Sequence, residues 1–528
     1  MGSRVPFKTM ALLTLACCCL AALDYHNFPY NDGAEHGAVV RELAENPFSP
    51  GEPMLGTFDG NSARYVPSAL LMAFASRLLS LDVLLVIKLF TVIYFVFFVA
   101  ALSLFTYEYF ADMRSALWSL LAVLFLWGTG WYGANAFMFS ALLSTAWFPS
   151  LVSFSCALLA LYFQLRFIKT RSFSMAFLQY SFAAVSFVCH PLTWVFYFIC
   201  SVLLCCERQG GSLRPIMVTG VISVVTALCA VAVWPYYDFI SNFVNVASGG
   251  LARTASDYQT TRDYLYSDIV LRIGPALAGI AGLVVCLKKR KHLLLWGGCA
   301  VFAGLYAAGY FLHISLAERF VFFTVFLLQL SFARIAALAS APGAEPVFRL
   351  PARMVTYICA SVLACGIVIQ VGLVWRDVVR PCFVLQPSFP FMHYESPNRE
   401  HMGLDALFGS GDVVFTDIFS GWSIPVYTGA RVVALLHTPP HVPDNYIRVR
   451  DSNAFFMLDR PLEEKWEILR RYSPSHILLN YRIIGPDMEP VLRGMGFEPL
   501  VQTESYVVFA VPSDSLGKSG AYAPAKHD

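Results

Sequence analysis

Residues 83–104 read VLLVIKLFTVIYFVFFVAALSL, a run in which Lys88 is the only charged residue. A membrane-spanning helix needs about 20 mostly apolar residues to cross the hydrocarbon core of a bilayer. The rest of the chain has a similar character: 57% of its 528 residues are hydrophobic, 14% are charged, and the mean hydropathy is +0.60. Soluble domains carry about 25% charged residues. The composition therefore predicts a polytopic α-helical membrane protein.

Eleven stretches are long and apolar enough for us to expect a membrane span. They lie near residues 9–23, 83–104, 115–131, 146–165, 174–189, 192–206, 215–236, 267–287, 293–312, 319–339 and 354–376. The stretch 66–81, VPSALLMAFASRLLSL, is short and carries Arg77. We expect it to form a helix at the membrane interface and not a span.

The distribution of Lys and Arg tests this count, because cytoplasmic loops carry an excess of both residues. With 66–81 left out, every basic loop falls on one side of the membrane. Its members are Arg4 and Lys8; Arg114; Arg166, Lys169 and Arg171; Arg208 and Arg214; 288–291 (KKRK); and Arg349 and Arg353. The first span is short enough to be a signal peptide. In either case we expect loop 24–82 and the tail after residue 376 to lie outside the cytoplasm.

Charge and cysteine content exclude some classes of function. The net charge is +2 and the basic residues are spread over many loops, so we expect no nucleic-acid partner. Of 14 cysteines, only Cys382 lies in the tail, and no C-x-x-C pair occurs. Disulfides and cysteine metal sites are therefore not expected.

The tail, 377–514, has the pattern of a soluble α/β domain. Short β-rich runs occur at 412–417 (DVVFTD), 430–436 (ARVVALL), 476–481 (HILLNY) and 505–511 (SYVVFAV). Segments 460–472 (RPLEEKWEILRRY) and 488–496 (MEPVLRGMG) have helical spacing. We expect the polar terminus 515–528 to be disordered.

The loop after the first span is unusually acidic. Residues 24–38 read DYHNFPYNDGAEHGA, with two Asp, one Glu and two His. The loop continues as RELAENPFSPGEP, whose first part is compatible with an interfacial helix, and returns to the membrane through LGTFDGNSARYVPS. An isolated acidic residue in a loop is usually only solvated. Five Asp, Glu and His residues within fifteen positions indicate a functional role instead.

These residues resemble the GT-C superfamily, polytopic glycosyltransferases that use polyprenyl-phosphate or polyprenyl-diphosphate sugar donors on the non-cytoplasmic face. The resemblance rests on DGAEHGAVVRELAENPFSP at 32–50, on RYVPSALLMAF at 64–74, and on the tail, whose strands and helices are similar to the outer α/β domains of bacterial members. It implies a glycosyltransferase of hexosyl or pentosyl type, inverting, in the bacterial inner membrane. The D-x-D motif is absent, which leaves the dependence on a metal open. The sequence establishes no cofactor, and a divalent cation, Mg²⁺ or Mn²⁺, is the candidate.

A positioned carboxylate suits sugar transfer because the acceptor hydroxyl must lose a proton as it attacks the anomeric carbon. Asp32, in a turn-forming Asp-Gly context, is our first choice of base, and Glu35 is the second. On a helix that begins near Asp32, the two would occupy about the same face. The alternative role for Asp32 is a helix N-cap. If neither residue acts, Asp24 or Asp59 would have to be the base.

The leaving phosphate needs a cation or a hydrogen-bond donor. Arg319 begins the tenth span on the expected outer side, in a short turn with His313 and Glu318; its alternative role is headgroup snorkelling or a pair with Glu318. His190 caps an outer hairpin, although a His beside Pro also fits an ordinary turn. His36 is a further candidate for orienting the base or contacting the phosphate. The weaker candidates Arg253, Arg262 and Arg272 flank a loop that could cover the donor.

The prediction is a glycosyltransferase that moves a sugar from a polyprenyl-phosphate donor to a glycan, lipid or protein acceptor. A transporter or flippase of a lipid-linked or sugar substrate is the main alternative. Transporters usually show internal repeats and ionisable residues at mid-membrane, whereas here no repeat is visible and the charges lie at the outer edge. A third reading, an assembly protein that docks through its tail, leaves the acidic loop unexplained.

Overall fold

The computed structural model describes residues 4–23, 32–56, 62–129, 135–210, 212–236, 265–314, 316–346, 350–376, 401–435, 442 and 444–512. These residues fall into two compact units, and each is described by itself. The first comprises the described residues within 1–28, 87–234 and 254–385. The second comprises those within 29–86, 235–253 and 386–528.

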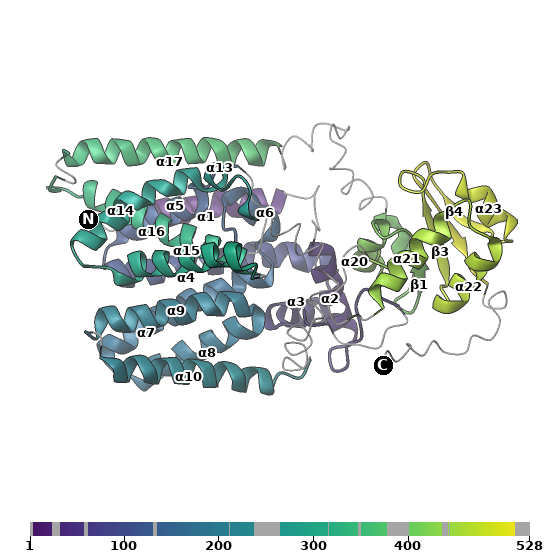
Figure 1. Cartoon of the computed structure of the whole chain (residues 1–528), viewed down its shortest axis with the longest axis horizontal. Helices are drawn as coiled ribbons and strands as arrows, with labels where there is room; N and C mark the ends of the chain where they lie inside the picture. The colour runs from purple at the N-terminus through teal and green to yellow at the C-terminus, as the bar shows by residue number, and fades with distance from the viewer. Residues whose placement is uncertain are drawn as a thin grey trace. The chain divides into compact units, whose positions relative to one another are not determined.

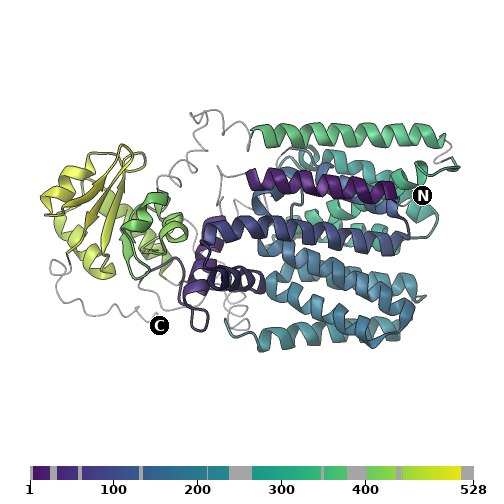
Figure 2. The same ribbon diagram turned by 180° about the vertical axis from the view of Figure 1, so that it is seen from behind.

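The first unit is a bundle of helices that run side by side along a common direction (Figure 1 and Figure 2). Its α-helices are α1 (Arg4–Leu23), α4 (Val83–Phe110), α5 (Met113–Phe125), α6 (Phe139–Thr145), α7 (Pro149–Thr170), α8 (Phe173–Cys189), α9 (Pro191–Arg208), α10 (Leu213–Ala232), α13 (Ile269–Ile273), α14 (Gly279–Lys288), α15 (Leu293–Leu312), α16 (Phe320–Ala339) and α17 (Ala352–Val374). Two 3₁₀ turns, η2 (Gly274–Ala278) and η3 (Ala317–Arg319), precede α14 and α16.

All eleven expected spans contain a helix. Within the described residues, eight helical segments are long and apolar enough to cross a membrane. The other three expected spans correspond to α1, α5 and α8, whose apolar parts are shorter. The stretch expected at the interface forms α3 (Pro67–Leu79), also a shorter apolar helix. The chain is therefore a polytopic helical membrane protein, as its composition predicted.

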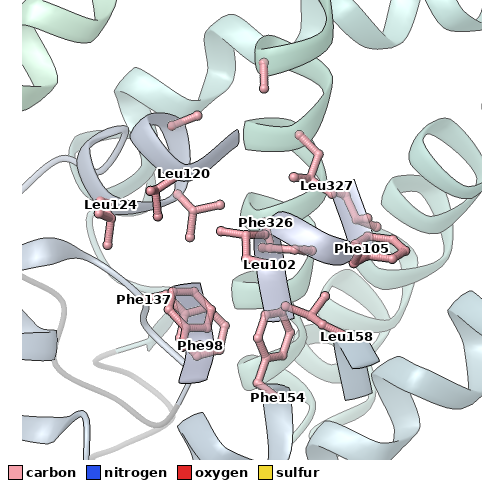
Figure 3. Packing of buried hydrophobic residues seen from close by; sticks show 14 of the residues in the cluster. Phe98, Leu102, Phe105, Leu120, Leu124, Phe137, Phe154, Leu158, Phe326 and Leu327 are labelled. Atoms are coloured by element: carbon pink, nitrogen blue, oxygen red, sulfur yellow. The ribbon is translucent and has the colours of Figure 1, made fainter. Parts of the chain in front are cut away.

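Aromatic and aliphatic side chains fill the bundle around α16. Most of the apolar window of α16 is buried, 83%, whereas only 17% of the window of α10 is buried, which places α16 inside the bundle and α10 at its periphery. Phe326 of α16 meets Phe154 of α7 edge to face with ring centroids 4.9 Å apart, and Phe98 stacks on Phe137 (Figure 3). Such aromatic pairs contribute about 0.5–1.5 kcal/mol beyond the area they bury.

Close contact between α14 and α16 depends on two glycines. A Cβ on Gly279 would lie 2.0 Å from the carbonyl oxygen of Leu328, and one on Gly282 would lie 2.1 Å from that of Ser331. Small residues let membrane helices approach at backbone distance, where van der Waals packing holds them together. Gly279 and Gly282 are one helical turn apart and so present one smooth surface to α16.

The second unit is built on a five-stranded sheet of order β2-β1-β3-β5-β4. Its strands are β1 (Val413–Phe415), β2 (Arg431–Val432), β3 (His476–Asn480), β4 (Pro499–Gln502) and β5 (Tyr506–Ala510). β1 is parallel to β2 and β3, whereas β5 is antiparallel to β3 and β4. Around the sheet lie α2 (Gly33–Glu45), α3 (Pro67–Leu79), η6 (His401–Ala406), η7 (Ser420–Trp422), α20 (Ile424–Thr428), α21 (Asn445–Phe456), α22 (Leu462–Tyr472) and α23 (Met488–Gly494).

Both faces of this sheet are covered, so its strands are apolar on both sides. On one face Phe415, Leu479 and Phe509 pack with Leu469 of α22 and Leu492 of α23. The opposite face is formed by alternate residues of the same strands. It packs with residues that precede the first long span, among them Ala38, Met54 and Leu55. The sequence runs expected as strands are confirmed for β1, β2, β3 and β5.

The loop after the first span extends this sheet. Gly56 N donates to Val432 O at 2.9 Å, Val432 N donates to Met54 O at 2.8 Å, and Leu55 forms a parallel bridge with Val432. The buried guanidinium of Arg448 donates to Gly56 O at 2.9 Å and to Val433 O at 3.1 Å. The loop therefore covers the β2 edge of the sheet, and the acidic helix α2 belongs to the same unit as the tail.

Candidate functional site

Asp32 occupies the residue before α2, with φ −52° and ψ −12°. Its side chain is exposed and accepts no hydrogen bond from the first turn of the helix. The backbone carbonyl alone participates, accepting from His36 N at 3.0 Å. Asp32 thus stands at the N-cap position without the side-chain bond of a cap, and its carboxylate is left accessible beside the positive end of the α2 dipole.

Glu35 has a different environment, although we expected it on about the same face as Asp32. Its side chain is 4% exposed and pairs with Arg64, whose Nε lies 2.6 Å from Glu35 Oε1. Arg64 Nη1 also lies 3.0 Å from His36 Nε2. Because a guanidinium can only donate, His36 Nε2 is the acceptor in this contact. Arg64 therefore links Glu35 and His36, and Asp32 is the exposed member of the cluster.

Burial raises the pKa of the Glu35 carboxyl above its ordinary value. The charge of Arg64 opposes this increase, while the neighbouring carboxylates of Asp32 and Glu52 add to it. These interactions also place Asp32 within electrostatic reach of Arg64. The cluster consequently holds several carboxylates around one permanent cation, which keeps a positive charge next to the exposed base candidate.

Polar contacts at its other end fix α2 within the unit. Glu42 Oε1 accepts from Gly51 N at 2.9 Å and from Asn46 Nδ2 at 3.0 Å, and Glu42 Oε2 lies 3.5 Å from Arg431 Nη2. Arg41 donates to the carbonyl oxygen of Val426 through Nε at 3.2 Å and through Nη2 at 3.1 Å. Since these contacts order both sides of the helix, the position of Asp32 is set by a rigid element and not by a free loop.

In the first unit, His190 is held at the hairpin between α8 and α9. Its Nδ1 accepts from Thr193 N at 3.3 Å, so the ring caps the N-terminus of α9, which begins with Pro191. Thr193 Oγ1 lies 2.8 Å from His190 Nδ1 and donates to Asn135 Oδ1 at 2.9 Å. The expected turn is therefore real, and His190 has a structural role in it.

Arg319 ends the turn η3 and precedes α16. Its side chain is half-buried, and among the described residues it forms no hydrogen bond or ion pair, with Glu318 or any other. His313, at the end of α15, is exposed in the left-handed region with φ 55°. The local pair between Arg319 and Glu318 is thus not formed, and the guanidinium stays available to a ligand.

Arg272, the one described member of the weaker basic candidates, is buried and donates to Ser267 Oγ at 3.4 Å. Arg253 and Arg262 lie outside the described residues, as do Asp24 and Asp59. No group of three or more His, Cys, Asp or Glu residues within the described ranges is arranged to hold a metal ion. Of the two oxygens of the Glu35 carboxylate, Oε1 is engaged by Arg64.

Arg64 is the member of the cluster that the sequence did not single out. It is the first residue of the RYVPS segment, 29 positions after Glu35, and no periodicity connects the two. Its neighbour Tyr65 is fully buried and donates to Gly51 O. The available signal was chemical: a buried carboxylate requires a cation, and Arg64 is the basic residue of the return segment 54–66.

Comparison with known proteins bears on the fold. No protein-family model matches the chain, and no curated protein sequence matches it either. Among solved structures, an oligosaccharyltransferase of Archaeoglobus fulgidus is similar, with TM-score 0.51 and 12% identity over 90% of this chain and 69% of that one. The mycobacterial arabinofuranosyltransferase AftD is also similar, with TM-score 0.55 and 12% identity over 96% of this chain and 40% of that one. The chain shares the fold of these two proteins, which is the architecture that the resemblance to the GT-C superfamily predicted.

The two matches cover 90% and 96% of this chain, so the likeness is not confined to a few spanning helices. The chain spans 40% of the length of AftD. At 12% identity the likeness establishes architecture, and the chemistry has to be argued from the residues of this chain.

Proposed function

We propose that this protein is a glycosyltransferase that moves a sugar from a polyprenyl-phosphate donor to a hydroxyl of a glycan, lipid or protein acceptor. The GT-C fold supports the reaction class. The observation that carries the proposal is the geometry around Asp32: an exposed carboxylate at the start of an ordered helix, without a capping bond and within electrostatic reach of the Arg64 cation.

In the proposed reaction Asp32 accepts the proton of the acceptor hydroxyl as its oxygen bonds to the anomeric carbon. The bond between that carbon and the phosphate oxygen breaks, its electron pair goes to the phosphate, and polyprenyl phosphate leaves. A single displacement of this kind inverts the configuration at the anomeric carbon. Positioned general bases contribute about 10² to 10⁴-fold to such steps.

Glu35 is assigned a positioning role in this scheme. Because its carboxylate is buried and bound to Arg64, it is poorly placed to meet an acceptor, but it fixes the guanidinium and, through it, His36. Asp32 therefore ranks above Glu35 as the base. The exposed part of Arg64, about a third of its side chain, is a donor of charge-assisted hydrogen bonds to an anionic substrate group.

In the first unit, Arg319 is proposed to bind the donor phosphate, on the ground that its guanidinium has no protein partner among the described residues. His190 and His313 are secondary candidates for binding the donor phosphate. His36 is a secondary candidate as well, after Arg64, for contact with an anionic group of the substrate. No step is assigned to Mg²⁺ or Mn²⁺, because the described residues offer no suitable set of ligands.

The location is proposed from the distribution of basic residues. We place the protein in a bacterial plasma membrane, with the sheet-containing unit on the non-cytoplasmic side, where polyprenyl-linked sugars are consumed by enzymes of this fold. A single Cys introduced at Ser515, in a cysteine-free variant, would then react with a membrane-impermeant thiol reagent in intact cells. Labelling only after permeabilisation would contradict this orientation.

The function is tested by incubating the purified full-length protein with a panel of polyprenyl-phosphate sugars and candidate acceptors. Mass spectrometry should detect released polyprenyl phosphate and a glycosylated acceptor in equal amounts for at least one donor. The Asp32→Asn protein serves as the control for non-enzymatic hydrolysis. Release of lipid phosphate at equal rates from wild type and control would contradict the proposal.

A further inference from the structure

A second cluster of charged and aromatic side chains lies at the end of the first unit that carries the basic turn 288–291. The rings of Tyr109 and Phe110, at the end of α4, lie 4.9 Å apart, and each faces the ring of His292, at 5.2 and 5.4 Å. None of these residues belongs to the proposed transferase site. They form a compact aromatic platform between α4 and the start of α15.

Two guanidinium groups stack on this platform. Arg208, at the end of α9, lies 5.4 Å from the centroid of the Tyr109 ring, and Arg334, of α16, lies 5.4 Å from that of Phe110. Arg334 is about fifteen residues beyond Arg319, or about 22 Å along the helix. That distance brings it from one edge of an apolar layer about 30 Å thick toward the other, where lipid phosphates lie.

The hydrogen bonds of Arg334 are incomplete. Its Nη1 donates to Ser115 Oγ at 3.3 Å, but Nε is buried and has no acceptor within the part of the chain that the structure describes. Nδ1 of His292 and Nε1 of Trp296, on the adjoining segment, are also buried without a hydrogen-bond partner among the described residues. An intramembrane arginine with donors to spare indicates a missing anionic partner.

The nearby carboxylates leave Arg334 without an ion pair in the described part of the chain. Glu207 Oε2 accepts from Tyr109 OH at 2.9 Å and from Leu294 N at 3.1 Å, while its Oε1 lies 3.5 Å from Arg208 Nε. Asp112 accepts from two backbone N–H groups at the start of α5 and from Ser115 Oγ. Within the described residues Arg208 therefore has a carboxylate at ion-pair distance, whereas Arg334 has none.

The charges of these basic residues also act on His292. Burial lowers the pKa of His292 to about 4, and the charges of Arg334, Arg208 and Lys291 lower it further in the same direction. The His292 ring is therefore neutral at physiological pH and adds no positive charge to the cluster, while the basic residues around it favour the binding of an anion.

We infer that this cluster binds the phosphate of an anionic phospholipid headgroup, with the half-buried Arg334 and the more exposed Arg208 as the phosphate ligands and the buried rings of Tyr109 and Phe110 holding the two guanidinium groups in place. Two features favour a lipid: the guanidinium groups lie near the end of the spanning helices, and the Lys and Arg distribution predicts that this end faces the leaflet rich in anionic lipids. Basic pockets between spanning helices on that side suit such headgroups. This inference is independent of the proposed transferase activity.

The experiment is native mass spectrometry of the full-length protein released from bilayer discs that contain equal amounts of phosphatidylglycerol and phosphatidylcholine. The wild type should retain phosphatidylglycerol selectively. Arg334→Gln and Arg208→Gln should each reduce that retention about fivefold, the effect of one basic residue on an anionic lipid. Arg214→Gln, which removes the same charge from an exposed position on α10, should leave retention unchanged.

Equal retention of the two lipids by the wild type would overturn the inference, as would an Arg214→Gln loss as large as that of Arg334→Gln. If Arg334→Gln fails to fold, the retention of phosphatidylglycerol by Arg208→Gln and the lipid preference of the wild type still test the inference. Inorganic phosphate added to the wild type separates the two sources of the anion. If it displaces phosphatidylglycerol at millimolar concentration, the ligand is a soluble phosphate and the lipid assignment is wrong.

Discussion

The most informative perturbation is a pair of isosteric changes at the acidic cluster, Asp32→Asn and Glu35→Gln. Each removes one carboxylate while it keeps the size of the side chain. The structure predicts opposite outcomes for the two, because one carboxylate is exposed and uncapped while the other is buried against a guanidinium. The pair therefore separates loss of a general base from loss of structural support.

For Asp32→Asn the expected change in stability is small, within about 0.5 kcal/mol, because no side-chain hydrogen bond is lost at an exposed position. The expected loss of turnover is about 10² to 10⁴-fold, the range of general-base contributions. For Glu35→Gln, removal of one partner of a fully buried ion pair costs about 3–5 kcal/mol. Since the Arg64 side chain is 33% exposed, solvent screening reduces the expected cost to about 1–3 kcal/mol.

The assay combines initial rates of sugar transfer with thermal unfolding of the same detergent-solubilised preparations. Asp32→Asn should unfold like the wild type and bind the donor, yet transfer sugar at no more than about 1% of its rate. Glu35→Gln should unfold at a lower temperature and keep more of its turnover. A Glu35→Gln variant that is stable but inactive, beside a nearly active Asp32→Asn variant, would refute the ranking.

Three further predictions concern other parts of the chain. Arg319→Ala should raise the KM for the lipid donor with little change in unfolding temperature, and an unchanged KM and turnover would reduce Arg319 to an interfacial anchor. Burial lowers the pKa of His401 to about 4, so the unfolded chain binds the His401 proton at a higher pH than the folded chain does. The free energy of unfolding should therefore fall from about pH 6.5 toward pH 4, by about 2 kcal/mol at pH 5. Unfolding measured across that pH range should show a smaller fall for His401→Gln. Gly282→Ala should destabilise the protein by about 1–3 kcal/mol, because its Cβ would meet the Ser331 carbonyl. The matched change Gly304→Ala, in open space, should stay within about 1 kcal/mol of wild type. Equal unfolding temperatures for the two variants would contradict a close α14–α16 contact at Gly282.

The fold could be predicted from the sequence wherever one physical requirement dominates. A spanning helix must be apolar over about 20 residues, so α4, α15 and α16 were recognisable from length and composition alone. In the second unit, runs rich in β-branched residues predicted β3 and β5 because both faces of the sheet are buried. Pairing partners and strand order did not follow from the runs themselves.

Other elements were missed because their local signals are weak. β4 (Pro499–Gln502) is a four-residue strand that begins with Pro and pairs only with β5 in the described sheet. α21 (Asn445–Phe456) is polar and has almost no amphipathic pattern, although Arg448 and Phe455 are buried. Tertiary contacts decide both elements, and such contacts leave no periodicity in the sequence.

The candidate site was only half predictable. The helix at 33–45 and the acidic residues at its start followed from the sequence, but the difference between Asp32 and Glu35 did not. That difference comes from Arg64, which the chain brings to Glu35 from the other end of the loop. The attachment of α2 to the tail was equally hidden, since it depends on backbone bonds between 54–56 and β2.

The central claim, transfer and not transport, is tested most directly in sealed proteoliposomes that contain a polyprenyl-phosphate donor with an isotopically labelled sugar. With acceptor on one side, a transferase attaches the label covalently to the acceptor and releases one polyprenyl phosphate for each sugar transferred, and Asp32→Asn should abolish both. Label that crosses the bilayer still attached to its lipid, with no glycosylated acceptor and no released lipid phosphate, would instead identify a flippase.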